Sequence, residues 1–271
     1  MSRKLSFKVK FNLNTMKKGF LMLAIGLMSL VSMDGMSQKK NKVIAHRGAW
    51  KNTGATENSI GALEHAIKLG CYGSEFDVHM SADSVLYVLH DHSIQGTDIE
   101  KTNSAELSKI KLANGEQLPT LEAYLKAGSK QKKTRLILEI KTSKISKERS
   151  LALATKCVEL VKKMKVEKIT DYIAFSWDVC LKVKELAPKA HVEYLNGDKT
   201  PDEIQAAGLD GIDYHYTVLK KKEDYIPAMR QKKLTTNVWT VNSEEDLKYF
   251  LEKDVDYITT NEPELLLSLS K

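Results

Sequence analysis

Acidic side chains stand at two strand-like positions of this 271-residue chain. Glu75 and Asp77 are two residues apart in one apolar run, and Glu139 and Lys141 have the same spacing in another. Side chains at i and i+2 of a strand share a face, so each pair points one way. Three converging carboxylates would repel each other unless a cation lay between them, and oxygen ligands favour Mg²⁺ or Ca²⁺. The spacing predicts a site for one divalent cation, with surface ion pairing of Glu139 and Lys141 as the alternative.

Two histidines, His46 and His90, end other strand-like runs. Arg47 follows His46 directly, and a planar guanidinium binds phosphate oxygens well. Histidine titrates near neutral pH and can move a proton in either direction. A lone histidine on a strand is commonly structural, but two of them beside an arginine and an acidic cluster indicate proton transfer at a phosphate. His92 would replace His90 if the register were shifted, and His79 would share the face of the carboxylate two residues before it.

A repeating order of strands and helices must position these side chains. Short β-rich runs alternate with runs whose apolar residues recur every three or four positions, such as Ile60, Leu63 and Ile67. Helix-start signals occur around Thr200 and Ser243. Strand followed by helix, repeated, predicts a parallel sheet. The strand-like runs are Val43–His46, Ser74–Val78, Leu86–Leu89, Arg135–Ile140, Tyr172–Phe175, His191–Leu195, Gly211–Tyr214, Asn237–Val241 and Tyr257–Thr260.

Nine parallel strands are one too many for a barrel. The seven residues between Val78 and Leu86 are too few for a crossover helix, which needs at least about 10–12 residues. Leu86–Leu89 is therefore expected to return antiparallel, as a hairpin on the second strand. The predicted fold is α/β, a (β/α)₈ TIM barrel with a β-hairpin excursion after strand 2. The hairpin would bring His90 back towards Glu75.

Residues 1–38 are predicted to be a signal peptide. Two lysines precede 15 uncharged residues at 19–33, and small and polar residues follow. This run is short for a membrane-spanning helix, which needs about 20 apolar residues, although an uncleaved anchor is the alternative. Residues 1–15 are interpreted as a possible over-extended start, because Met16 would itself begin a normal signal. Residues 39–271 are then a single barrel domain, exported to the periplasm or the extracellular space, without a stable membrane anchor after cleavage.

The charge and the cysteines exclude several classes of protein. The net charge is +7, but residues 1–38 hold six basic residues and one acidic residue, which leaves 36 basic and 34 acidic residues for the rest. A domain with so small an excess has no broad field for nucleic acid. The cysteines lack the spacing of a zinc site or a disulfide framework and are expected to be buried apolar residues. They are Cys71, Cys157 and Cys180.

Seven short motifs follow one another along the chain in a recognisable order. Together they resemble the glycerophosphodiester phosphodiesterase family, of the phosphatidylinositol-phospholipase-C-like barrels. The resemblance extends from about Val43 to Pro263. Each motif alone is weak, whereas the seven in order are specific. The motifs are His46-Arg47-Gly48, Glu57-Asn58-Ser59, Glu75-Phe76-Asp77, His90-Asp91, Leu118-Pro119-Thr120-Leu121, Glu139-Ile140-Lys141 and Trp239-Thr240-Val241-Asn242.

The resemblance implies a role for each charged residue of these motifs. The family's metal ligands match Glu75, Asp77 and Glu139, and the cofactor would be one divalent cation, Ca²⁺ or Mg²⁺. Positions near the phosphate match Arg47 and Lys141.

The resemblance also covers the remaining site residues. The family's acid–base pair matches His46 and His90. Glu57 matches an acid that either binds the metal or orients the arginine. Trp239 fits core packing and a pocket floor equally well by its place on a strand, and the resemblance implies a substrate pocket. One departure is Asn261, which stands where the family commonly has an aspartate.

The activity implied is metal-dependent hydrolysis of glycerophosphodiesters to glycerol 3-phosphate and an alcohol, with the two histidines as general acid and base. A small-molecule glycerophosphodiester is the expected partner, and the sequence leaves the oligomeric state open. Two alternatives are a phospholipase of the C or D type that acts on lipid phosphodiesters, and a non-catalytic barrel that only binds phosphodiesters.

Overall fold

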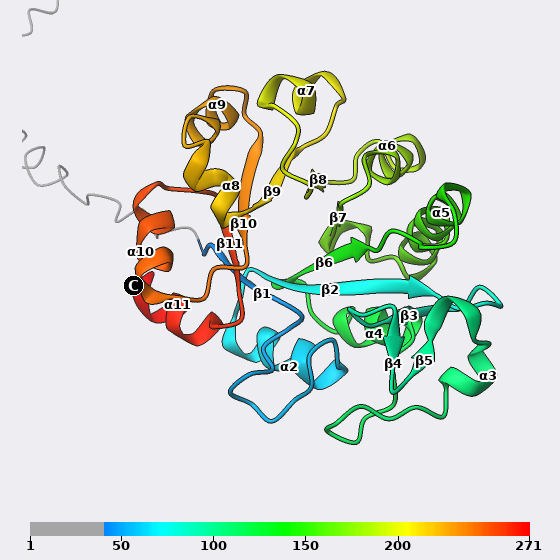
Figure 1. Cartoon of the computed structure of the whole chain (residues 1–271). Coiled ribbons are helices and arrows are strands. Elements are labelled where there is room, and N and C mark those ends of the chain that lie inside the picture. The colour runs from blue at the N-terminus through cyan, green and yellow to red at the C-terminus, as the bar shows by residue number, and fades with distance from the viewer. Residues whose placement is uncertain (1–40) are drawn as a thin grey trace, which may run out of the picture. The chain divides into compact units, whose positions relative to one another are not determined.

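A closed parallel barrel forms the body of the computed structural model, which describes residues 41–271 (Figure 1). Each strand pairs with its neighbours in the order β1-β2-β6-β7-β8-β9-β10-β11, and β1 also pairs with β11, which closes the ring. The eight-stranded parallel barrel predicted from the sequence is confirmed. In the described residues its strands are β1 Val43–Ala45, β2 Gly73–Met80, β6 Arg135–Ile140, β7 Thr170–Ala174, β8 Val192–Tyr194, β9 Gly211–His215, β10 Thr235–Trp239 and β11 Tyr257–Thr260.

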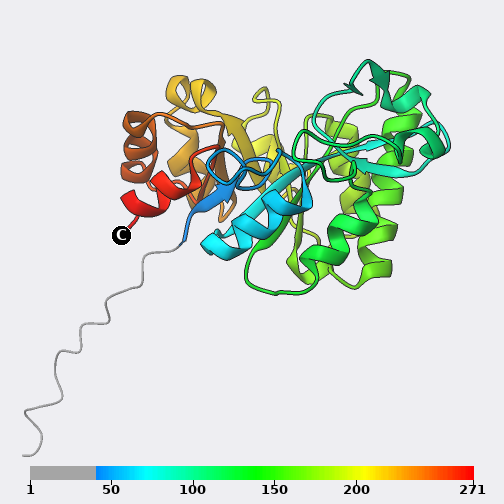
Figure 2. The ribbon, with the colours of Figure 1, turned by 90° about the horizontal axis from the view of Figure 1, so that it is seen from below.

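Helices surround the barrel on its outside (Figures 1 and 2). Most of them start with a side-chain cap: Ser59 accepts a hydrogen bond from the backbone N–H of Ala62, and Thr200 forms a reciprocal capping box with Glu203. The helices are α2 Ile60–Leu69, α4 Leu121–Gly128, α5 Lys147–Met164, α6 Trp177–Leu186, α7 Pro201–Ala206, α8 Tyr216–Lys221, α9 Tyr225–Gln231, α10 Glu244–Glu252 and α11 Pro263–Leu269, with short 3₁₀ turns at η2 Ile99–Lys101 and η3 Glu167–Ile169.

The hairpin excursion after the second strand is also confirmed. Strand β3, Leu86–Val88, runs antiparallel to β2, with Val78 opposite Val88. The turn contains no glycine, and Ser84 adopts the left-handed conformation that glycine commonly takes (φ 68°). The chain continues into elements that the sequence did not predict, a two-stranded ribbon and a short helix that share a small core with β3. They are β4 Ser93–Ile94, β5 Thr97–Asp98 and α3 Ser104–Leu107.

All nine predicted strands begin and end within two residues of the predicted bounds, and β10, which is shifted by two residues at both ends, shows why the bounds differ. Thr235–Trp239 replaces the predicted Asn237–Val241. Thr236 and Asn237 are fully or almost fully buried, so the strand starts with polar residues that a hydrophobic pattern does not count. Buried polar residues on a barrel strand are a first sign that the interior holds more than apolar packing.

Side chains along each strand point alternately outward, towards the helices, and inward, into the barrel. Outward residues such as Leu136 and Leu138 pack under the helices. Inward residues form an apolar layer inside the barrel, made of Ile44, Ile137, Ile173 and Leu195. The predicted burial of the cysteines is confirmed, since all three are buried and free.

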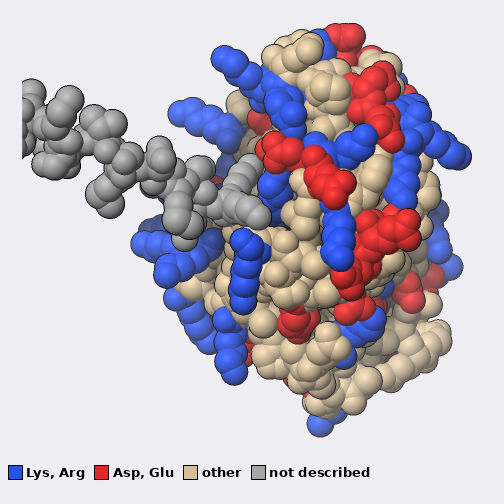
Figure 3. Space-filling view, turned by 90° about the vertical axis from the view of Figure 1, so that its left-hand side faces the viewer, with Lys and Arg blue, Asp and Glu red and all other residues tan. Residues whose placement is uncertain are grey.

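Basic and acidic side chains are interspersed on the face shown in Figure 3. Within residues 41–271, none of the helices has the length and apolar character needed to span a bilayer.

Candidate active site

Three acids meet at the end of the barrel where the parallel strands finish. Glu75 and Asp77 lie on β2, and Asp77 is the register partner of Glu139 on the neighbouring β6. Each acid offers one oxygen that lies within 4.8 Å of those of the other two, and all three side chains are buried. The i, i+2 spacing therefore placed Glu75 and Asp77 on one face, and the parallel pairing added Glu139.

The chain directly after β1 folds over this cluster in a strained turn. Arg47 has a positive φ of 56°, and its backbone N–H donates to Glu75 Oε2 at 2.8 Å. Gly48 follows with a φ of 80°, and a Cβ there would lie 2.7 Å from the backbone carbon of Ala62. Only glycine fits that close approach, which explains why this residue follows the histidine and arginine.

Two cationic side chains lie against the acids. Arg47 Nη1 donates to both carboxylate oxygens of Glu57, at 2.9 and 3.0 Å, and its Nε lies 3.8 Å from Asp77 Oδ2. Lys141 Nζ lies 3.1 Å from Asp77 Oδ1 and 2.9 Å from Glu139 Oε1. Glu57 thus contacts the arginine and is not part of the three-acid cluster, so its position fits the arginine-orienting alternative.

Asn58 has a structural part in the site that the sequence motif did not reveal. Its Nδ2 donates to Asp77 Oδ2 at 2.9 Å, and its Oδ1 accepts from the backbone N–H of Asp77 at 3.1 Å. It also adopts a positive φ of 60°, which asparagine tolerates well. The amide clamps Asp77 in one orientation. The motif Glu57-Asn58-Ser59 was the available signal, since it brings three polar residues to the start of α2.

Both predicted histidines reach the same pocket from different loops. His46 Nδ1 is 2.8 Å from Asn261 Oδ1, and its Nε2 is 3.9 Å from Glu75 Oε2. His90 follows the hairpin strand, and its Nδ1 is 2.7 Å from Asp91 Oδ1. The hairpin therefore returns His90 to the acidic cluster, as predicted. Asn261 was noted in the sequence only as a departure from a family pattern, and its contact with His46 was missed.

The other two candidate histidines do not take these places. His79 Nε2 contacts the backbone carbonyl of His90 at 3.0 Å, and its ring stands edge-on to His92, with 4.7 Å between centroids. Neither residue lines the pocket that holds His46 and His90. His79 therefore supports the loop that carries His90.

Burial and crowded charge set the protonation of the cluster. Burial raises the pKa of Glu75 well above its ordinary value, and Asp77 and Glu139 raise it further. Burial, together with Asp77, raises the pKa of Glu139 to about 7. For Asp77, burial alone would raise the pKa, but Lys141 and other cationic neighbours lower it to about 2. Burial and Arg47 lower the pKa of His46 to about 4, which favours a neutral ring.

The pocket above the cluster has a volume of about 120 Å³. Trp239 forms one wall, where it packs edge-on against Phe175 and donates its Nε1–H to the backbone carbonyl of Asp213 at 2.9 Å. Trp239 therefore packs against a neighbouring ring and also lines the pocket. The lining residues are His46, Arg47, Glu75, His90, Glu139, Lys141, Ile173, Phe175, Leu195, Asp213, Trp239, Thr240 and Thr259.

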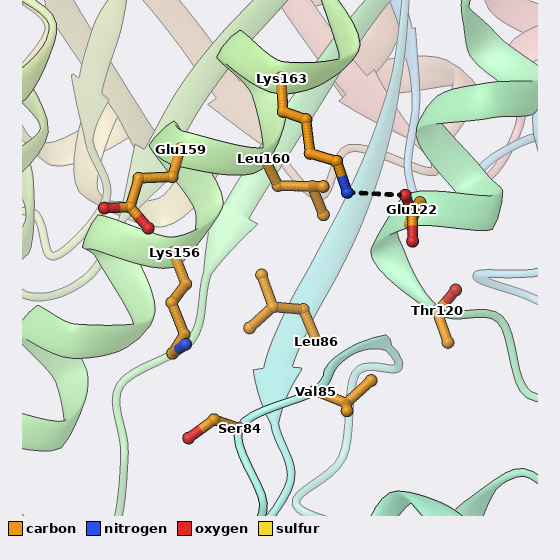
Figure 4. A pocket seen from close by; sticks show the side chains of 9 residues that line it. All are labelled: Ser84, Val85, Leu86, Thr120, Glu122, Lys156, Glu159, Leu160 and Lys163. Carbon is orange, nitrogen blue, oxygen red and sulfur yellow. Dashed lines mark hydrogen bonds and ion pairs between the residues drawn. The ribbon is translucent and has the colours of Figure 1, made fainter.

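A second hollow, of about 330 Å³, lies outside the barrel between the β3 hairpin and α5. Figure 4 shows Leu86 and Leu160 facing each other there, with an ion pair of Glu122 and Lys163 beside them. Both charged side chains are more than half exposed and already paired. This hollow therefore lacks the buried acids and histidines of the barrel mouth.

A parallel (β/α)₈ barrel with clustered acids, cationic side chains and two histidines at its C-terminal mouth has the fold and site of a barrel hydrolase that acts on phosphate esters. Residues 46–265 match the model of the glycerophosphoryl diester phosphodiesterase family. The chain belongs to this family and is an enzyme of the phosphodiesterase class. The family resemblance and the enzyme class predicted from the sequence are thus confirmed.

Individual relatives agree with this assignment. The crystal structure of a glycerophosphodiester phosphodiesterase from Parabacteroides distasonis is 46% identical, with a TM-score of 0.83, and the match covers 86% of this chain and 98% of that one. A glycerophosphodiester phosphodiesterase of Caldanaerobacter subterraneus is 28% identical over 85% of this chain and 98% of the relative. An Oleispira antarctica phosphodiesterase, solved with the product sn-glycerol 3-phosphate, is 20% identical with a TM-score of 0.72, over 84% of this chain and 95% of that one. This last likeness supports the fold.

Proposed function

We propose that this protein hydrolyses glycerophosphodiesters to glycerol 3-phosphate and an alcohol, with one divalent cation and two histidines. The observation that carries the proposal is the convergence of both histidines, Arg47, Lys141 and two acids of the three-acid cluster, Glu75 and Glu139, on one pocket, with Asp77 completing the cluster. Family membership supports the same reaction. The small volume of the pocket, about 120 Å³, suits a short polar group better than an acyl chain.

The acids fit a divalent cation by their charge and by an unused ligand atom. When all are ionised, the carboxylates of Glu75, Asp77, Glu139 and Glu57 carry four negative charges against the two cations Arg47 and Lys141, an excess of two that a divalent cation would neutralise. Glu75 Oε1 is buried and has no hydrogen-bond donor among the described residues. Ca²⁺ or Mg²⁺ would be held by Glu75, Asp77 and Glu139, and would act as a Lewis acid on the phosphate oxygens.

Arg47 and Lys141 bind and orient the phosphate. Arg47 Nη1 donates to both oxygens of Glu57, which anchors one end of the guanidinium, and the backbone turn at Arg47 directs it over the cluster. Arg47 Nε lies 3.8 Å from Asp77 Oδ2 but has no hydrogen-bond partner within residues 41–271, so this donor can bind a phosphate oxygen. Lys141 adds a second positive charge that stabilises the charge developing on the phosphoryl group.

The hydrogen bonds of the two histidines suit opposite roles. Asn261 presents its amide oxygen to His46 Nδ1, so that nitrogen donates, and Nε2 is left as the base that takes a proton from the nucleophile. Asp91 accepts a hydrogen bond from His90 Nδ1 and so orients the ring, and His90 donates a proton to the leaving alcohol. The nucleophile is water or a hydroxyl of the substrate itself. Water completes the hydrolysis in one step, whereas the substrate hydroxyl forms a cyclic phosphate that water opens in a second step, with the roles of the histidines reversed.

Release of glycerol 3-phosphate from glycerophosphocholine tests the proposal, with the protein first treated with EDTA and then supplied with Mg²⁺ or Ca²⁺ separately. We expect turnover to fall to background after chelation and to return with at least one ion. An unchanged rate in EDTA would remove the cation from the proposal.

Parallel incubations separate the two alternatives. Faster hydrolysis of intact phosphatidylcholine or sphingomyelin would favour the phospholipase of the C or D type. Binding of glycerophosphocholine without turnover, with either ion present, would favour the non-catalytic barrel.

We also propose that residues 1–38 direct export and are removed, so that residues 39–271 act in the periplasm or outside the cell. The basic start and the uncharged run at 19–33 support this. Mass determination of the protein recovered from the exported fraction tests it. A protein that retains residues 1–38 in that fraction would contradict cleavage and favour an anchor.

A further inference from the structure

A buried acid on β9 lies in the pocket without any role in the proposed acid cluster. Asp213 is 1% exposed and lines the pocket together with Trp239 and Leu195. Its Oδ1 is buried and has no hydrogen-bond donor among the described residues. A buried polar atom left unpaired costs roughly 1–3 kcal/mol, so a group retained in this state calls for an explanation.

The nearest strands do not supply a partner. Asn237 on β10 is the register neighbour of Asp213, but its amide oxygen accepts from the backbone N–H of Val238 at 2.8 Å and from Thr259 Oγ1 at 3.3 Å. The Nδ2 of Asn237 has no partner within the described chain and is not bonded to Asp213. Trp239 donates to the backbone carbonyl of Asp213 and does not supply a donor to Oδ1.

The other inward acids of the barrel either have a paired partner or, like Glu75, belong to the acid cluster. Glu193 on β8 is equally buried, but it is paired with His191 at 2.9 Å and lines a separate lower hollow. Glu139 contacts Lys141 in the acid cluster. Asp213 Oδ1 thus has no partner among the described residues, and Asp213 lines the same pocket as the cationic residues that would bind the phosphate.

We infer that Asp213 accepts a hydrogen bond from a hydroxyl of the glyceryl group and so selects substrates by that group. The inference rests on the proposed function, because it places the phosphate at Arg47 and Lys141. A hydroxyl supplies the missing donor, and the glyceryl carbons would pack against the apolar wall of Trp239, Phe175 and Leu195. A bare alkyl group would fill the same space and leave Asp213 unpaired.

The test compares three ethanolamine phosphodiesters by their release of ethanolamine. One carries glycerol, one carries propane-1,2-diol and lacks the terminal hydroxyl, and one carries propane-1,3-diol and lacks the secondary hydroxyl. We expect the wild-type protein to prefer the glycerol compound over at least one analogue by about 10- to 100-fold in kcat/KM. In Asp213→Leu this preference should shrink to within about threefold, through loss of rate on the glycerol compound and on the analogue that keeps the bound hydroxyl.

Two further variants separate selectivity from a structural effect. Asp213→Asn keeps an oxygen acceptor and should retain part of the preference. Glu193→Gln removes a buried acid from the same barrel interior, outside the pocket, and should keep the full wild-type preference. Thermal unfolding of each variant shows that the compared proteins are folded, and Asp213→Leu should not be less stable, since it removes an unpaired buried acid.

Equal losses on all three compounds in Asp213→Leu, or an unchanged preference, would overturn the inference and leave the proposed function standing. A wild-type protein that hydrolyses none of the three, with Mg²⁺ or Ca²⁺ present, would overturn the proposed function and this inference together.

Discussion

The two ends of the barrel interior both contain charged side chains, but these are paired at one end and crowded with like charges at the other. At the base, where the strands begin, Arg135 forms two hydrogen bonds with Asp171, and His191 pairs with Glu193 at 2.9 Å. At the mouth, one oxygen of each acid of the cluster lies within 4.8 Å of those of the other two, and the two cationic side chains of Arg47 and Lys141 contact the cluster. The hollow at the base has a volume of only about 10 Å³, against about 120 Å³ at the mouth. Both hollows belong to the barrel interior that also holds the apolar layer with Ile137.

We interpret the base as the end that stabilises the fold and the mouth as the end that binds a ligand. Buried charges that are paired and hydrogen-bonded satisfy one another within the protein. Unmatched acids lower the stability of the folded chain until something neutralises them, a cost commonly found at functional sites. The comparison therefore predicts that the same change has different effects at the two ends.

The largest effect is expected on activity, from loss of either histidine at the mouth. His46→Ala and His90→Ala should each lower kcat for glycerophosphocholine by roughly 10²–10⁴-fold, the usual range for an acid–base group. His191→Gln at the base is the matched control and should change kcat by less than about threefold. Steady-state kinetics on the folded proteins measures all three. Near-wild-type turnover in both mouth variants would break the comparison.

The same substitution at the two ends should next give different stabilities. In EDTA, Glu193→Gln should lower the free energy of unfolding by about 1–3 kcal/mol, because it removes the partner of His191. Glu75→Gln should change it by less than about 1 kcal/mol or raise it, because it relieves repulsion among the acids. Urea unfolding measures both. The assignment of a strained mouth and a stable base is contradicted if Glu75→Gln proves the more damaging change.

The smallest expected effect is on the pH dependence of stability. Burial alone would lower the pKa of His191, but Glu193 with Asp171 and Asp210 raises it from 6.5 to about 9. A pKa raised by folding gives stabilisation that is complete below about pH 6.5 and is lost as pH rises through about 9.

Urea unfolding of the wild-type protein and His191→Gln between pH 6 and 9.5 checks this prediction. The wild-type protein should lose on the order of 1 kcal/mol more than the variant over that range. Parallel curves for the two proteins would show that the base pair does not carry this charge.

The local pattern of the sequence was enough to predict most of the fold. Alternation of β-rich and helical runs indicates a parallel sheet, and the seven residues before Leu86 require an antiparallel return, because chain length limits how strands connect. The i, i+2 spacing placed Glu75 and Asp77 on one face for an equally local reason. The ribbon of β4 and β5 was not predicted, because four residues in two short strands leave almost no periodic signal.

Only the tertiary structure decided which residues meet across strands. Asn58 reaches Asp77, and Asn261 reaches His46 across 215 positions, because neighbouring strands and loops of the closed barrel lie side by side. The isolation of Asp213 is likewise invisible in a sequence, since an unpaired group is defined by the absence of neighbours in space. Residue types and spacing therefore determined the chemistry available to this protein, while closure of the barrel determined which groups were paired and which were left free for a ligand.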